Sequence, residues 1–70
     1  MTLREAAAEL QQKFGRSPWL SAVGIAETGE EAGTIFLYIA RSNIQTRDLE
    51  RSGYAGWTVR VRELGGPITN

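Results

Sequence analysis

The segment Thr34–Ala40 constrains the fold of this chain more than any other, because it reads Thr-Ile-Phe-Leu-Tyr-Ile-Ala without a charge, a Gly or a Pro. Most of these residues are β-branched or aromatic, which favours a pleated strand. Side chains alternate along a strand, so one face carries Ile35, Leu37 and Ile39 and the other carries Phe36 and Tyr38. Both faces are apolar and need cover. Helices of the chain itself can cover one of them.

The chain has 70 residues, and we expect residues 1–70 to form one small α/β domain. A domain of this size buries only about 60% of its unfolded surface. Disulfides, a metal or a partner subunit usually stabilise such domains. The absence of Cys and His removes disulfides and the commonest metal ligands. We therefore expect no cofactor and a homo-oligomer, most simply a dimer.

The charge balance gives no global attraction to nucleic acid or to an anionic membrane, because 8 basic residues face 8 acidic ones. The N-terminus does not resemble a secretory signal. No apolar run reaches the roughly 18 residues that a membrane span needs. We expect no membrane association and a cytoplasmic location.

A capping box at Thr2 and Glu5 predicts a helix over residues 3–14. Gly15 is expected to end this helix, and Pro18 prevents its continuation. The apolar stripe for packing on a sheet has a spacing typical of a helix, and consists of Leu3, Ala7, Leu10 and Phe14.

Residues 19–26 predict a first strand of small and apolar residues. One face would carry Trp19, Ser21, Val23 and Ile25, and the other Leu20, Ala22, Gly24 and Ala26. The second set is small, which favours close approach of a helix or another backbone, and Gly24 favours such an approach or a bulge. Residues 27–33 read as a hairpin loop. Its glutamates are expected to be solvated, because a cation loop would also use Asp or Asn.

A second helix is predicted over residues 43–52, capped by Ser42 or Asn43, with Gln45 completing a box from Ser42 and Thr46 as an alternative cap. Ile44 and Leu49 are its expected apolar anchors. Gly53 is expected to end it.

Residues 57–63 predict the last strand, in which apolar and polar residues alternate: Trp57, Val59 and Val61 point inward, and Thr58, Arg60 and Arg62 outward. Gly65-Gly66-Pro67 ends this strand, and residues 68–70 read as a loose tail.

The predicted order is helix, strand, strand, helix, strand. A helical crossover makes the second and third strands parallel, although the third could lie beside either of the other two. The expected fold is an α+β two-layer sandwich, a three-stranded sheet with both helices on one face. The other face is left open.

The open face is the predicted interface, consisting of Phe36, Tyr38, Thr58, Arg60 and Arg62. Aromatic residues and Arg are enriched in interface hot spots. We expect a non-enzymatic interaction or assembly module that self-associates through this face. The alternative is a single-stranded nucleic-acid platform, in which bases stack on the rings beside the arginines. The balanced charge disfavours it.

Catalysis is not expected. The chain has no His or Cys, no Gly-x-Ser-x-Gly elbow and no phosphate-binding Gly-x4-Gly-Lys-Ser/Thr loop. Acidic and basic residues of the second helix, such as Asp48 and Arg51, read as a solvated face.

One set of motifs resembles a known module: Val23-Gly24-Ile25, a polar loop, Ile35–Ile39 and then Tyr54–Val61. It is similar to the small accessory module of bacterial proteins related to trypsin-like peptidases, and the match covers about residues 19–66. The catalytic triad of that family is missing here. The resemblance implies a stand-alone accessory fold without proteolysis, and no catalytic residue is carried over.

Overall fold

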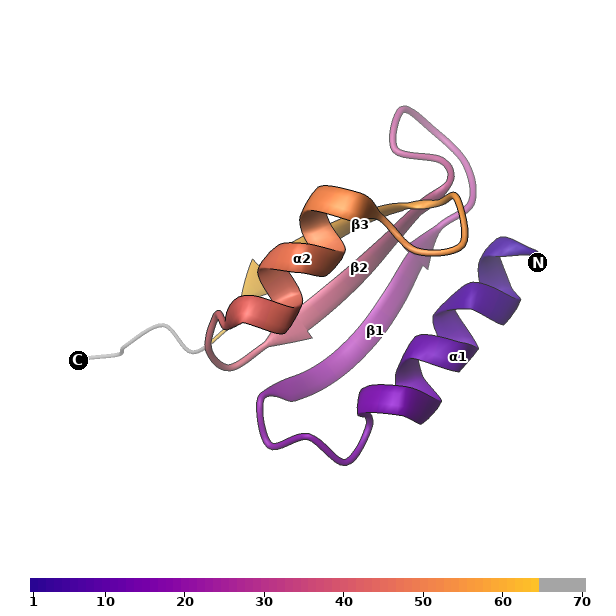
Figure 1. Cartoon of the computed structure of the whole chain (residues 1–70). Coiled ribbons are helices and arrows are strands. Elements are labelled where there is room, and N and C mark those ends of the chain that lie inside the picture. Colours follow the sequence, from indigo (N-terminus) through magenta and orange to yellow (C-terminus); the bar gives the residue numbers. More distant parts are fainter. Residues whose placement is uncertain (65–70) are drawn as a thin grey trace.

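The computed structural model describes residues 1–64 and has two layers, a three-stranded sheet and a pair of helices on one of its faces (Figure 1). The elements are α1 (Leu3–Phe14), β1 (Leu20–Ala26), β2 (Thr34–Ile39), α2 (Ile44–Ser52) and β3 (Thr58–Glu63). The predicted fold class and element order are confirmed. The segment predicted to end the last strand, residues 65–67, and the predicted tail, residues 68–70, lie outside the described residues.

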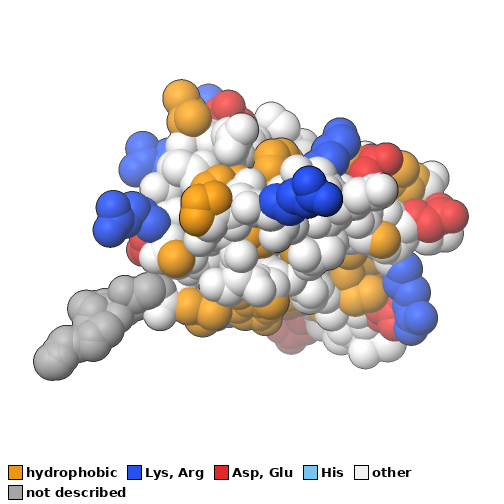
Figure 2. Space-filling view, turned by 90° about the horizontal axis from the view of Figure 1, so that it is seen from below, with side chains coloured by type: hydrophobic (Ala, Val, Ile, Leu, Met, Phe, Trp, Pro, Cys, Tyr) orange, Lys and Arg blue, Asp and Glu red, His pale blue; other side chains and the backbone are white. Residues whose placement is uncertain are grey.

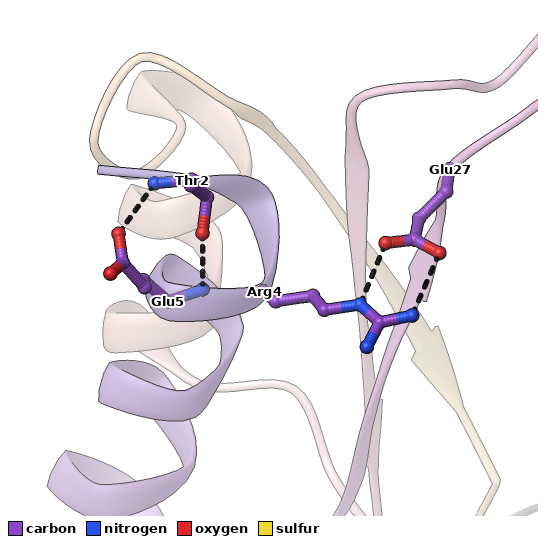
Figure 3. Close-up of polar contacts among 4 residues, drawn as sticks. All are labelled: Thr2, Arg4, Glu5 and Glu27. Carbon is purple, nitrogen blue, oxygen red and sulfur yellow. Dashed lines mark hydrogen bonds and ion pairs between the residues drawn. The ribbon is translucent and has the colours of Figure 1, made fainter.

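Helix α1 begins with the predicted capping box (Figure 3). The Glu5 amide donates to the Thr2 hydroxyl at 3.1 Å, and the Thr2 amide donates to the Glu5 carboxylate at 2.8 Å. This satisfies two amides that the helix itself leaves without partners. The face of α1 on the sheet buries Leu3, Ala6 and Leu10.

Strand β2 is the centre of the sheet, with β1 antiparallel on one side and β3 parallel on the other. The structure thus decides the position of the third strand, which the sequence left open. Residues paired across neighbouring strands share a face. Leu37 is aligned with Val23 of β1 and with Val61 of β3, which places all three on the helix side.

Strand β1 departs from strict alternation at its start. The register shifts between Leu20 and Ala22, so that Leu20 pairs with Ile39 on the helix side and Ala22 pairs with Tyr38 on the other side. An extra residue in one strand leaves Ser21 in a bulge and reverses the face of the residue before it. The predicted placement of Leu20 with Ala22 is therefore wrong, and the bulge lies away from Gly24.

Helix α2 is capped by Asn43, whose side chain accepts from the Thr46 amide, while the Thr46 hydroxyl accepts from the Asn43 amide. The alternative box from Ser42 to Gln45 does not form. Ile44 is 74% exposed and Thr46 is 0% exposed, so the predicted anchoring role of Ile44 is wrong. With Asn43 as the cap, Thr46 and the half-buried Leu49 share the inner face, and Ile44 points away from it.

A tight turn after α2 joins the two helices through side chains. Tyr54 and Trp57 exchange backbone hydrogen bonds at 2.8 and 2.9 Å, and the residues between them, Ala55 and Gly56, have positive φ. The Tyr54 hydroxyl donates to Glu9 of α1, and the Trp57 indole donates to the Met1 carbonyl at 3.2 Å. The core therefore lies between the sheet on one side and the helices and this turn on the other. Its buried apolar residues are Leu3, Ala6, Leu10, Ile35, Leu37, Ile39 and Val59.

Candidate functional site

The sheet face opposite the helices carries all the residues predicted to form an interface. In the register, Phe36 is aligned with Gly24 and Arg60, and Tyr38 with Ala22 and Arg62. We call this surface the open face, and it consists of Ala22, Gly24, Ala26, Thr34, Phe36, Tyr38, Thr58, Arg60 and Arg62. Both helices and the core cluster belong to the other side of the sheet.

Two aromatic rings form the centre of the open face. Phe36 and Tyr38 stack with ring centroids 6.5 Å apart and planes inclined by 26°. Both residues stay half-buried, although neither belongs to the core. The guanidinium carbon of Arg62 lies 5.5 Å from the Phe36 ring centroid, a cation–π arrangement. The rings are therefore held in place by neighbours of the same face.

A strip of small residues on β1 forms the other half of the open face. Ala22, Gly24 and Ala26 present almost no side chain, and the Tyr38 ring leans over Gly24. Sequence reasoning found that this strip is small but expected a helix or a backbone to approach it. The structure shows a tyrosine ring instead. The register shift at Ser21 is the feature that sequence reasoning missed.

The β3 side of the open face is polar and exposed. Thr58, Arg60 and Arg62 are all exposed. Arg60 Nε lies 3.8 Å from a carboxylate oxygen of Glu31, in the β1–β2 loop, which makes a loose ion pair. Such exposed pairs contribute little to stability, but this one offsets part of the positive charge beside the rings.

The acidic loop between β1 and β2 is tied to two arginines. Glu27 accepts from Arg4 at 2.8 and 3.3 Å, a two-pronged contact seen in Figure 3. The Arg4 guanidinium holds the pKa of Glu27 below its usual range, and the hydrogen bonds that Arg4 donates to Glu27 raise the pKa of Arg4. The contact fixes the first turn of α1 to the end of β1, on the helix side of the sheet.

Two shallow hollows lie away from the rings of Phe36 and Tyr38. One, of about 420 Å³, is lined by Leu3, Glu27, Ala32, Gly33 and Trp57, and the other, of about 230 Å³, lies between the end of α2 and the start of β3. The carboxylate in the first is already bound to Arg4. Within residues 1–64, no three His, Cys, Asp or Glu side chains gather as metal ligands would. None of the helices in this part of the chain has the length and apolar character to cross a membrane.

Comparison of the chain with protein-family models, with curated proteins and with solved structures finds no match. The resemblance to the accessory module of peptidase-related proteins stays a prediction.

Proposed function

We propose that this protein is a non-enzymatic interaction module that self-associates by packing the open face of one copy on the open face of another. The observation that carries the proposal is the position of Phe36 and Tyr38. They are large, half-buried rings on the sheet face that no described helix covers. Monomeric proteins seldom leave a contiguous apolar surface without a use.

The two halves of the open face are complementary in shape. β2 carries large rings, whereas β1 carries Ala22, Gly24 and Ala26. A twofold axis can set the rings of each copy against Ala22 and Ala26 of the other, because sheets that pack face to face interdigitate at a spacing of about 10 Å. Gly24 stays covered by Tyr38 of its own copy. Homodimers with such isologous contacts are the commonest oligomers.

The energetic effect is large for so small a domain. Full burial of an aromatic or aliphatic side chain contributes about 1.5–3 kcal/mol relative to its exposure. Phe36 and Tyr38 are only half-buried in the single chain, and a second copy would bury the rest of their surface. Domains of this size have a net stability of only about 5 kcal/mol at the low end of the usual range. Self-association would also shield the apolar side chains of the open face from water.

A nucleic-acid platform on the same face is the competing candidate. Arg60 and Arg62 flank the rings as phosphate contacts would. However, Arg62 already covers Phe36 and Arg60 is near Glu31, and the net charge of the chain is 0. These observations favour a protein partner over a strand of nucleic acid.

Sedimentation velocity over a concentration series tests the proposal. We expect the unmodified chain to associate at tens of micromolar, and Phe36→Glu and Tyr38→Glu each to reduce that association. Ile44→Glu is the matched control, because Ile44 is an exposed apolar residue on α2, away from the open face. Circular dichroism checks that each variant is folded.

A chain that stays monomeric at tens of micromolar would contradict the proposal. Fluorescence anisotropy with labelled single-stranded oligonucleotides tests the competing candidate. Binding tighter than about 10 µM that weakens steeply with salt would favour nucleic acid instead.

A further inference from the structure

The outer edge of β1 differs from the other edge of the sheet, and this difference points to a second contact between copies. β1 and β3 are both edge strands, since the sheet order is β1-β2-β3. An edge strand presents unpaired N–H and C=O groups, which natural proteins usually block with charges or cover. The two edges of this sheet differ in this respect: charged side chains block the β3 edge, whereas β1 contains no charged residue.

The β3 edge is blocked. Arg60, Arg62 and Glu63 place charges along the strand. In addition, the Glu50 carboxylate of α2 reaches over the edge and accepts from the Val61 amide at 3.3 Å. A further strand could not pair here without displacing that carboxylate.

Within residues 1–64, no charged side chain blocks the β1 edge in this way. Its sequence, Leu-Ser-Ala-Val-Gly-Ile-Ala, contains no charge and no Pro. Figure 2 views the molecule from the side where β1 is the edge of the sheet in Figure 1. It shows hydrophobic and other uncharged surface over much of this side, interrupted by one Lys or Arg side chain near the centre, with the other charged side chains toward the margins.

The backbone groups that point outward can be assigned from the pairing. Leu64 donates to the Ile39 carbonyl, so Ile39 and its alternates in β2 direct their backbone groups toward β3, whereas the Ala40 amide donates to the Trp19 carbonyl on the β1 side. Phe36 and its alternates therefore bond toward β1, where their partners are Ala22, Gly24 and Ala26. It follows that the backbone groups of Val23 and Ile25 point out of the sheet. No side chain of residues 1–64 bonds to them.

We infer that the β1 edge pairs with the β1 edge of a second copy, antiparallel about a twofold axis at Gly24. In this register Val23 of each copy exchanges backbone hydrogen bonds with Ile25 of the other. Gly24 then faces Gly24 of the second copy on the open face, where the lack of side chains allows the close approach of a non-hydrogen-bonded pair. The result is a continuous six-stranded sheet with an unbroken core side.

Helix α1 is compatible with this contact. Arg4 reaches Glu27 at the end of β1, so the side of α1 toward β1 also carries the residues one and two turns later, Ala8 and Gln11. That side meets the same side of the second α1, and apart from the neutralised Arg4–Glu27 pair it is uncharged. The opposite side of α1, with Glu9, contacts Tyr54.

The edge contact is independent of the face-to-face contact under Proposed function, and it is best measured in the Phe36→Glu variant. We expect amide hydrogen exchange at Val23 and Ile25 in this variant to slow at least about tenfold between 20 µM and 1 mM protein, whereas exchange at Val61 stays constant. In a mixed sample of labelled and unlabelled protein, we expect a contact between the Gly24 α-protons of the two copies.

Ala22→Lys and Thr58→Lys form a matched pair, because both residues are exposed on the open face and they lie on opposite edge strands. In the Phe36→Glu background, Ala22→Lys is expected to weaken dimerisation about tenfold by placing a lysine on the pairing edge, and Thr58→Lys to leave it unchanged. Exchange rates at Val23 and Ile25 that do not depend on concentration would overturn the inference, even if the face-to-face contact holds. If Phe36→Glu fails to reduce association, that result contradicts the face-to-face contact and leaves the edge contact standing.

Discussion

The ring of Tyr38 occupies the space above Gly24 that a side chain would otherwise fill. A Cβ placed on Gly24 would lie 3.3 Å from Cε2 of Tyr38 and 3.9 Å from its hydroxyl. The aromatic side chain of the central strand therefore covers a glycine of the edge strand, and the two residues together set the shape of the open face.

Substitution of Gly24 should move the Tyr38 ring with little loss of stability. For Gly24→Ala we expect the preference of about 0.5–1 kcal/mol for Ala over Gly within a strand to offset the cost of a small shift of the Tyr38 ring. Gly24→Val should displace the ring and weaken face-to-face association. Urea denaturation and sedimentation measure the two effects. Unchanged Tyr38 ring resonances in Gly24→Val would contradict this account.

Gly53 should be far less tolerant of substitution than Gly29. Both have positive φ, 76° and 86°, but a Cβ at Gly53 would lie 2.5 Å from the Trp57 carbonyl oxygen, whereas at Gly29 it would meet nothing within 4 Å. We expect Gly29→Ala to cost about 1 kcal/mol through backbone strain alone, and Gly53→Ala about 3 kcal/mol or more. Equal shifts in the thermal midpoints of the two variants would argue against the collision.

The turn at Ala55-Gly56 offers a stabilising change. Its residues have φ values of 52° and 84° between hydrogen-bonded Tyr54 and Trp57, the pattern of a type I′ turn. Asn is preferred to Ala at the first of these positions, because it adopts left-handed backbone more readily. Ala55→Asn should therefore raise the free energy of unfolding by about 0.5–1 kcal/mol. Ala8→Asn, on exposed helix, is the control and should lower it.

Acid should destabilise the fold through two exposed glutamates. Hydrogen bonds from Thr2 lower the pKa of Glu5, and the Arg4 contact lowers the pKa of Glu27. A carboxylate with a lower pKa in the folded state stabilises the fold above its unfolded pKa, near 4.3, and loses that effect as the pH falls through the folded value.

Urea denaturation from pH 7 to pH 2.5 tests this dependence. The free energy of unfolding should decrease as the pH drops below about 4.5. Glu5→Gln and Glu27→Gln should each make this decrease shallower. Glu30→Gln is the control, since within residues 1–64 Glu30 makes no side-chain hydrogen bond or ion pair. The same steep fall in all three variants would contradict the assignment.

Much of the architecture could be predicted because its signals are local. The Thr2–Glu5 box fixes where α1 begins, and the alternation in β2 and β3 separates Leu37 and Val59 from Phe36 and Arg60. Ile44 shows where such signals stop being sufficient. Ile44 and Leu49 are five residues apart, about 140° around the helix, so they cannot both point at the sheet, and the packing of Thr46 and Leu49 leaves Ile44 exposed.

The sequence by itself determined the two helices, the three strands and the division of β2 into a face for the helices and a face for the rings, because these follow from capping groups and from the period of neighbouring residues. Only the tertiary structure decided that β3 lies beside β2, that Ser21 forms a bulge, that Tyr38 covers Gly24 and that Glu50 blocks one edge while the other stays open. Each of these is a contact between segments apart in the chain, and its energy depends on how the strands are ordered and registered in space rather than on the residues next to it in sequence.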